Sequence, residues 1–428
     1  MVKNETLDFL YGLQMFGIKL GLEHSQRLLQ SVDNPQNDYG IIHVAGTNGK
    51  GSVCAFLREI LTQAGYRVGT YTSPHLHRFN ERITINDRPI ADAELEALVQ
   101  ELRNKNPELP ATFFEVTTAL ALLYFSREQV DLVVLEVGMG GRLDATNVVQ
   151  PLVSVVTPVS VDHALYLGSS IVEIAAEKGG IIKSHTPVVI ARQTPEVLQV
   201  LLNQATRCNC DSFVYGRDFH ALEVDGSLTV ESLQQSWVGL HPGLAGQHQQ
   251  DNVATALMAL ECLRDKGYSV AGNAVSRGVQ QVRWAGRLEW WSDEHSVDEY
   301  SQKWPPILLD GAHNEAGALV LVDYLRCQDL TAIRWIGGFK VDKDVAAILA
   351  ALLPVTQMFY ALAPPVEEPY PADALEKHLV SCGMQFQRYS DIASALWDAR
   401  QDCLPGEIVV VAGSLFLVAA CREYLLSL

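Results

Sequence analysis

The sequence is poor in positive charge. Its 32 lysines and arginines are outnumbered by 50 aspartates and glutamates, which gives a formal net charge of −18. This balance argues against a nucleic-acid partner and against an anionic membrane surface. A polyanionic ligand would therefore have to be bound by local features, such as glycine loops, single basic side chains and metal ions.

Paired cysteine motifs and long apolar runs are also absent. Of the eight cysteines only Cys208 and Cys210 lie close together, and no pair of C-x-x-C units appears, which argues against a zinc site. The longest apolar stretch, 409–421, contains Gly413 and Ser414 and is too short to span a bilayer. The N-terminal residues MVKNETLDFL lack an apolar signal core. We expect a soluble, cytoplasmic protein with reduced thiols.

What the sequence does contain is a regular alternation of strand and helix patterns, which is typical of an α/β fold. At 428 residues the chain is too long for one core, so two domains are expected. The predicted strands of the first part are 41–45, 67–72, 131–137, 152–157 and 187–191, and the predicted helices are 52–64, 91–104, 113–127, 170–178 and 195–206. A short β excursion is expected over 211–245, followed by helical periodicity over 252–264.

The segment WWSDEHSVDEYSQKWPP (290–306) is acidic and ends in two prolines, and it interrupts this alternation. It therefore predicts the boundary between the two domains. After it a new α/β series begins, with strands near 306–310, 332–336, 356–362 and 407–412 and a final helix from Leu415. We therefore expect a first domain over 1–289, a linker over 290–305 and a second domain over 306–428.

The stretch HVAGTNGKGS (43–52) is the most informative motif. An apolar strand precedes it and an amphipathic helix follows, so Gly46, Gly49 and Gly51 lie where a strand leads into a helix N-terminus. Backbone N–H groups and the helix dipole make such a turn an anion site, and Lys50 adds the full charge that a triphosphate needs. A Walker A loop would place glycine at 44 and Ser or Thr at 51, where this chain has Val44 and Gly51, so a narrower family than the generic P-loop kinases or GTPases is indicated.

Several polar side chains follow other predicted strands and are candidates for the same site. Glu136 ends the apolar run before GMGGRLDATN, the position at which P-loop proteins bind the magnesium ion of the nucleotide. His163 follows the next strand. Lys178 precedes two glycines, in the last turn of a predicted helix. It could be a functional residue, or it could be an ordinary cation that interacts with the helix dipole at the C-terminal end. The loop YTSPHLHRFNERI (71–83) could either meet an anionic ligand or form a polar surface loop.

These motifs together resemble the folylpolyglutamate synthase family of the Mur ligase superfamily, and specifically its bacterial bifunctional dihydrofolate synthase/folylpolyglutamate synthase branch. The stretches that carry the resemblance are HVAGTNGKGS, YTSPHL, FFEVTTALA, LEVGMGGRLDATNVV, AAEKGGIIK and DGAHN, in the order of the family. They lie within residues 17–314, and the last third is similar mainly in its α/β pattern. The resemblance implies an α/β fold, with a P-loop ATPase domain built on a mostly parallel sheet and a smaller Rossmann-like C-terminal domain.

The resemblance also implies the activity and its participants. The reaction would be ATP-dependent ligation of L-glutamate to dihydropteroate and to the γ-carboxyl of folates, through an acyl phosphate, in folate biosynthesis and one-carbon metabolism. The implied cofactors are ATP, magnesium at two sites and a monovalent cation. The implied partners are small molecules only, with no nucleic acid and no membrane, and we expect a monomer.

The site residues implied by the resemblance fall into three groups. ATP would be bound by Thr47, Asn48, Gly49, Lys50, Asn252, Arg287 and Asp310. The magnesium ions would be bound by Ser73, Glu136, His163 and a modified Lys178, with Lys50, His163 and Lys178 acting in catalysis. The pterin would be lined by Gly17, Ile18, Lys19, Leu20, Thr112, Phe113, Phe114, Glu115, Leu143, Asp144 and Ala145.

Two other functions are compatible with parts of this pattern. A muramyl-type amino-acid ligase shares the GT-x-GK loop, but it needs a sizeable domain ahead of the loop, where this sequence has only residues 1–42. A nucleotide-binding regulatory or transport ATPase would not need His163 and Lys178 beside Glu136, and its ATP turnover would not depend on glutamate.

Overall fold

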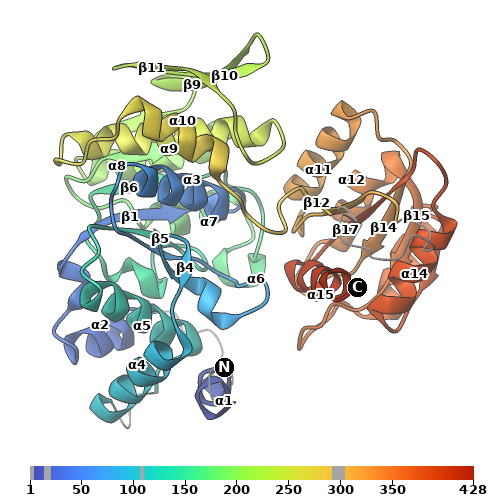
Figure 1. Ribbon diagram of the computed structural model, residues 1–428, viewed down its shortest axis with the longest axis horizontal. Helices are drawn as coiled ribbons and strands as arrows, with labels where there is room; N and C mark the ends of the chain where they lie inside the picture. Colours follow the sequence, from blue (N-terminus) through green and yellow to red (C-terminus); the bar gives the residue numbers. More distant parts are fainter. Residues whose placement is uncertain (1–3, 14–20, 107–109, 292–303) are drawn as a thin grey trace. The chain divides into compact units, whose positions relative to one another are not determined.

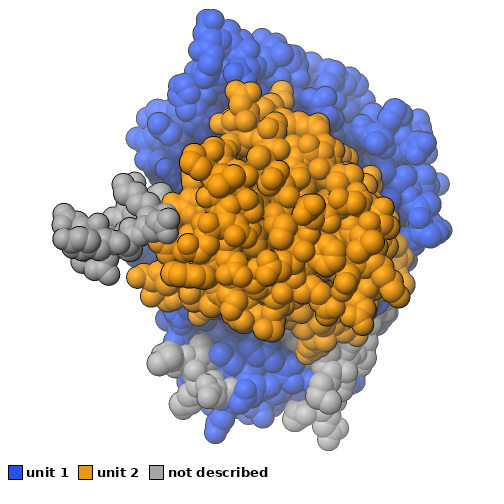
Figure 2. Space-filling view, turned by 90° about the vertical axis from the view of Figure 1, so that its right-hand side faces the viewer, with its two compact units in different colours: residues 1–161, 166–243, 249–283 blue, residues 162–165, 244–248, 284–428 orange. Residues whose placement is uncertain are grey.

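The computed structural model describes residues 4–13, 21–106, 110–291 and 304–428. They divide into two units, which Figure 2 shows in separate colours. Unit 1 comprises residues 1–161, 166–243 and 249–283, and unit 2 comprises residues 162–165, 244–248 and 284–428. None of the helices in these described ranges combines the length and the apolarity that a bilayer crossing requires.

Unit 1 is built on an eight-stranded sheet with the order β4-β3-β2-β5-β1-β6-β7-β8. Its strands are β1 (Gly40–Ala45), β2 (Val68–Tyr71), β3 (Ile83–Ile85), β4 (Arg88–Pro89), β5 (Leu132–Glu136), β6 (Val153–Val156), β7 (Val188–Ile190) and β8 (Ser212–Val214). All neighbours pair in parallel except β3 and β4, which form an antiparallel edge. Every residue of β5 and β6 is buried, as expected for central strands covered on both faces. The predicted strands and the mostly parallel sheet are confirmed.

Helices cover both faces of this sheet (Figure 1). The helices of this part of the chain are α1 (Asn4–Gly12), α2 (Glu23–Gln30), α3 (Lys50–Gln63), α4 (Asp92–Lys105), α5 (Phe113–Arg127), α6 (Ala164–Leu167), α7 (Ile171–Gly179), α8 (Pro195–Arg207), α9 (His248–Arg264) and α10 (Gly272–Gln281). Helix α3 packs on β1, β2 and β5 and against α10, whereas α5 packs on β2 with α2 and α4 outside it. The predicted β excursion is a separate antiparallel sheet of β9 (Phe219–Val224), β10 (Ser227–Ser232) and β11 (Ser236–Leu240).

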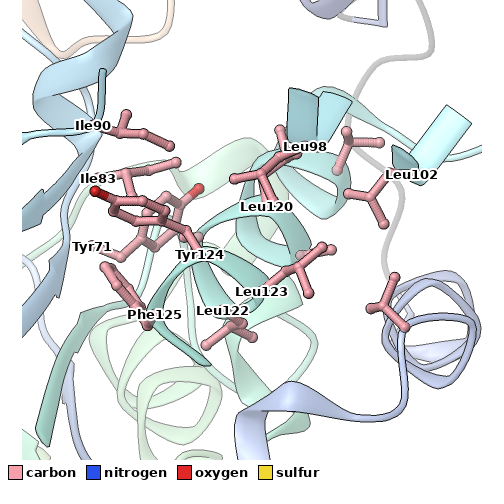
Figure 3. Packing of buried hydrophobic residues seen from close by; sticks show 14 of the residues in the cluster. Tyr71, Ile83, Ile90, Leu98, Leu102, Leu120, Leu122, Leu123, Tyr124 and Phe125 are labelled. Carbon is pink, nitrogen blue, oxygen red and sulfur yellow. The ribbon is translucent and has the colours of Figure 1, made fainter. Parts of the chain in front are cut away.

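One apolar core of unit 1 lies between the sheet and α5. Figure 3 shows Tyr71 and Ile83, from β2 and β3, beside Tyr124 and Phe125 of α5. Helix α5 is buried from Glu115 to Phe125 and begins at a capping box, in which the side chains of Thr112 and Glu115 accept hydrogen bonds from each other's backbone N–H groups. The start of α5 is therefore held firmly at the edge of this core.

Unit 2 repeats the α/β plan with a six-stranded sheet of order β12-β13-β17-β14-β15-β16. Its strands are β12 (Glu289–Trp291), β13 (Ile307–Leu309), β14 (Ile333–Gly337), β15 (Thr356–Ala361), β16 (Phe386–Arg388) and β17 (Ile408–Ala412), and its helices are α11 (Glu315–Cys327), α12 (Val345–Leu352), α13 (Ala372–Ser381), α14 (Ile392–Asp402) and α15 (Leu415–Leu426). Only β12 pairs antiparallel, with β13. Strand β12 extends two residues into the predicted linker 290–305, of which 292–303 lies outside the described residues.

Candidate active site

The glycine-rich turn connects β1 to α3, as the sequence predicts. Gly46 has φ +148°, and a Cβ there would lie 1.8 Å from Oγ1 of Thr157. Gly49 has φ +85° and caps α3, which begins at Lys50, two residues before the predicted start. Neither conformation suits a residue with a side chain, so both glycines are required by the turn. The Lys50 ammonium donates to the Thr47 carbonyl at 3.2 Å, which places a cation at the helix N-terminus.

The turn is held by neighbouring elements of unit 1. The amides of Thr47 and Asn48 donate to the Pro158 carbonyl at 2.9 and 3.2 Å. A Cβ on Gly49 would lie 2.7 Å from Oδ1 of Asn252, so that side chain of α9 lies directly against the helix start. Asn252 in turn donates to Gln249, which donates to Ser52 of α3. Asn252 therefore lies beside the phosphate loop.

Glu136 ends β5 next to this turn, because it pairs in register with Val44 of β1. Its side chain is 4% exposed, and Oε2 accepts a hydrogen bond from the Ser73 amide at 2.9 Å. A carboxylate and a serine from neighbouring strand ends offer the oxygen ligands that magnesium prefers. The residues present in unit 1 thus fit a hard divalent cation.

Lys178 lies at the same turn and is not a surface cation. Its side chain is buried, and the ammonium donates to the Gly46 carbonyl at 2.8 Å. The helix-end cation that the sequence offers as the alternative is therefore a buried one, directed at the glycine-rich turn. A Cβ on Gly141 would lie 2.8 Å from the carbonyls of Glu177 and Lys178, so the GMGGRLDATN loop packs against the end of α7.

That loop is tied to β1 by a buried chain of hydrogen bonds. His43 Nε2 lies 2.9 Å from Thr146 Oγ1, which lies 2.5 Å from Asp144 Oδ1. An ionised carboxylate only accepts, so Thr146 donates to Asp144 and His43 donates through Nε2–H. Burial, with the nearby charge of Lys183, lowers the pKa of His43 to about 3 and keeps it neutral. Burial raises the pKa of Asp144, although the Met139 amide and Thr146 both donate to it.

The segments predicted to line the pterin lie in part near this loop. A Cβ on Gly138 would lie 2.4 Å from the Phe114 ring. Phe113 stacks on Tyr11 of α1, with ring centroids 5.9 Å apart. Thr112 and Glu115 are engaged in capping α5. Gly17, Ile18, Lys19 and Leu20 lie outside the described residues, so their predicted role stays a prediction.

The predicted residues of unit 2 form a group of their own. Asp310 follows β13, and its two oxygens accept from the amides of Leu288 and Ala312, each at 2.9 Å. A Cβ on Gly311 would lie 2.0 Å from an Arg287 nitrogen, so the Arg287 guanidinium lies next to this turn. Asp310 and Arg287 are thus brought together as neighbours.

His163 belongs to a second cluster in unit 2, which the sequence analysis did not find. Asp162, His163 and Asp342 each offer a potential metal-ligating atom within 4.8 Å of the others. The Lys343 ammonium lies 2.5 Å from Asp162 and 3.4 Å from Asp342, so it already supplies positive charge to both carboxylates. Burial opposes ionisation of Asp162, but His313, His163 and Lys343 outweigh it and lower its pKa well below the ordinary value. The adjacent acidic and basic residues of VDKD (341–344) were the available signal.

Comparisons with known proteins identify the family. The family model described as Mur ligase middle domain matches residues 44–260, and the model described as Dihydrofolate synthetase, C-terminal domain, matches residues 293–423. The dihydrofolate synthase/folylpolyglutamate synthase of Bacillus subtilis is 33% identical over 98% of both chains. The chain belongs to the dihydrofolate synthase/folylpolyglutamate synthase family. It is therefore a ligase of the Mur ligase superfamily, as the sequence motifs predict.

Solved structures of family members agree with the fold. A Mycobacterium tuberculosis folylpolyglutamate synthase complexed with ADP and AMPPCP matches with TM-score 0.88 and 31% identity, over 99% of each chain. The Escherichia coli FolC in complex with DHPP and ADP matches with TM-score 0.87 and 30% identity, over 99% of this chain and 98% of that one. The predicted two-part α/β architecture of this family is confirmed.

Proposed function

We propose that this chain uses ATP to join L-glutamate to dihydropteroate and to the γ-carboxyl of folates. One observation carries the proposal: a phosphate loop, a buried strand-end carboxylate and a buried lysine meet around Gly46 in unit 1. Family relatives named dihydrofolate synthase/folylpolyglutamate synthase, and an E. coli relative bound to DHPP and ADP, support the same reaction.

The chemistry follows from the poor reactivity of a carboxylate, which would have to expel oxide to accept an amine. A carboxylate oxygen of the substrate attacks the γ-phosphorus of ATP, and ADP leaves. The glutamate nitrogen then attacks the acyl carbon, phosphate leaves and a proton is lost. Lys50 neutralises negative charge during phosphoryl transfer, because transfer of this kind depends mostly on positioning and charge.

The division of residues is part of the proposal. Thr47, Asn48, Gly49 and Lys50 would bind the phosphates, and Asn252, Arg287 and Asp310 would be further contacts of ATP. Ser73 and Glu136 would bind one magnesium, and Glu136, His163 and Lys178 a second. Magnesium would supply a Lewis acid that screens the phosphate charge. A monovalent cation, a monomeric state and the domain limits 1–289, 290–305 and 306–428 remain part of this proposal.

The first experiment measures ATP turnover with and without dihydropteroate and glutamate. We expect turnover to need both, and glutamate-independent hydrolysis would favour a regulatory ATPase. Oxygen-18 in the substrate carboxylate should then appear in the released phosphate, because the acyl phosphate passes one carboxylate oxygen to phosphorus. Unlabelled phosphate in every turnover would contradict the acyl phosphate.

We further propose that Lys178 is carbamylated when active. A free ammonium is a poor neighbour for two magnesium ions, whereas a carbamate offers the oxygen ligands that they prefer. Its remaining N–H could still donate to the Gly46 carbonyl. Lys178→Ala should lose most activity, and acetate should restore part of it. Wild-type activity in Lys178→Ala would mean that this residue is only a structural cation.

A further inference from the structure

The loop 71–83 places two arginines in opposite environments. Arg78 is exposed and pairs with Asp92 at 2.8 Å. Arg82, the last residue of the short helix η3 (Phe79–Arg82), is only 8% exposed. The sequence allows the loop 71–83 to be either a polar surface loop or part of an anion site. Arg78 fits the first description, because it is on the surface, and Arg82 fits the second, because it is in the interior.

The groups that contact Arg82 carry no negative charge. Its Nε donates to Nδ1 of His75 at 2.7 Å, and its guanidinium carbon lies 5.2 Å from the centroid of the Phe113 ring. Because Nδ1 of His75 accepts this hydrogen bond, it carries no proton, and an imidazole supplies no negative charge in either of its protonation states. The phenols of Tyr71 and Tyr11 also act on Arg82, and a phenol is uncharged near pH 7.

Arg82 is thus a buried cation without a counter-ion. Among the described residues, no Asp or Glu oxygen lies within 4.0 Å of its guanidinium, although Glu136 acts on it from farther away. Burying an arginine without an anion opposes folding. Proteins rarely retain such a charge unless a bound ligand supplies the counter-charge. The position therefore calls for an anionic ligand.

The neighbours of Arg82 indicate the shape of that ligand. Phe113 forms a stack with Tyr11 and an edge contact with Phe79, which makes an aromatic surface beside the guanidinium. Tyr71 ends β2 two residues before Ser73, whose amide binds the Glu136 carboxylate. Arg82 thus adjoins both a surface suited to flat rings and the acidic strand ends near the phosphate loop.

We propose that Arg82 is the counter-ion of the substrate's reacting carboxylate, in the form of an aryl carboxylate whose ring lies beside Phe113. A planar guanidinium binds a carboxylate through two parallel N–H···O bonds, which fixes its orientation as well as its charge. Arg82 would hold the carboxylate before phosphoryl transfer. This inference rests on the proposed function, since it assigns one residue to the substrate of that reaction.

The test is a cycle that changes the enzyme and the ligand separately. Dissociation constants of pteroate and of its carboxamide analogue are measured without ATP, by fluorescence titration, for wild type, Arg82→Gln and Arg78→Gln. We expect wild type to bind the carboxylate about 10- to 100-fold more tightly than the carboxamide. A difference of this size is what charge-assisted hydrogen bonds contribute. The preference should vanish in Arg82→Gln and persist in Arg78→Gln, the matched control from the same loop.

The outcomes separate this inference from the proposed function. If wild type and Arg82→Gln keep the same preference, the inference is wrong and the proposed function stands. If wild type binds neither ligand while ADP still binds, the proposed function fails and this assignment fails with it. If Arg78→Gln loses the preference for the carboxylate as completely as Arg82→Gln does, the effect comes from the overall charge of the loop. That result would contradict a direct pairing of Arg82 with the carboxylate.

A stability measurement distinguishes a binding residue from a structural one. Arg82→Met removes the unpaired charge and keeps an apolar stem against Phe113. We expect the ligand-free Tm to stay the same or rise, and the increase in Tm caused by pteroate to shrink. A ligand-free Tm lowered by several degrees, with the pteroate-induced increase unchanged, would mean that Arg82 serves only the fold.

Discussion

The two units bury a positive charge in different ways. In unit 2 the Lys343 ammonium lies between Asp162 and Asp342, and its side chain is 5% exposed. In unit 1 the Arg82 guanidinium is buried to a similar degree but has a neutral imidazole and an aromatic ring as its neighbours. The same desolvation cost is balanced inside the chain in one unit and, by our proposal, by the substrate in the other.

The difference shows how burial alone misleads. A buried cation with carboxylate partners stabilises the fold only as long as both partners remain, because removing one leaves a buried charge. A buried cation without carboxylate partners does not stabilise the fold in this way. Its burial instead indicates that an anionic ligand binds beside it. His43 is a third case in which burial removes the charge altogether.

The largest effect is expected for Lys343→Met, which leaves Asp162 buried without its lysine partner. Asn314 and His313 still lie 3.2 and 3.4 Å from Asp162, but the lysine ammonium is lost. Loss of one partner of a buried pair costs about 3–5 kcal/mol of unfolding free energy. Urea unfolding followed by tryptophan fluorescence reports on unit 2, because every tryptophan except Trp237 belongs to it. The exposed Lys377→Met is the control, and equal midpoints for the two variants would contradict the comparison.

Lys50→Ala should affect the reaction rather than the fold. Lys50 is partly exposed and its ammonium donates to a backbone carbonyl, that of Thr47, so its loss leaves no buried charge behind. Losing one preorganised charge at the phosphoryl group should raise the barrier by about 3 kcal/mol, or roughly 100-fold or more in kcat. Ligation kinetics and urea unfolding are measured together, with the exposed Lys105→Ala as control. Near-normal turnover would remove Lys50 from the phosphate site.

His43 should make the stability of unit 1 depend on pH. Its folded pKa of about 3 lies below the unfolded value of about 6.5, so the unfolded chain binds the extra proton first. The contribution of His43 is therefore complete above pH 6.5 and is lost as the pH falls toward 3, by about 2 kcal/mol between pH 7.5 and 5. Hydrogen exchange of the β1 amides should show this loss, and His43→Gln should reduce it. An unchanged pH dependence in the variant would mean that folding does not shift the pKa of His43.

The smallest effect is expected for Arg78→Ala. Its side chain is 63% exposed, and an exposed ion pair such as the one with Asp92 contributes less than about 1 kcal/mol. We expect a change within about 0.5 kcal/mol in urea unfolding and wild-type kinetics. A larger loss would place Arg78 in the same class as Lys343 and would weaken the contrast within the loop 71–83.

The local features of the site could be predicted from the sequence. Gly46, Gly49 and Lys50 stand between an apolar strand and an amphipathic helix, and that context requires a turn with inward N–H groups. Glu136 ends a buried strand, which fixes its place at the sheet edge. The contrast between Arg78 and Arg82 could not be predicted, because both are arginines of one polar loop and only packing against Phe113 separates them.

By itself the sequence determined the order of strands and helices and the position of the phosphate loop, because those depend on periodicity and on glycine conformation over a few neighbouring residues. The tertiary structure alone decided which charges meet. Lys178 reaches the Gly46 carbonyl across 132 positions, and Lys343 reaches Asp162 across 181. Whether a charge is paired, neutral or left for a ligand depends on its desolvation and on partners far away in the chain, and neither is visible in a local pattern.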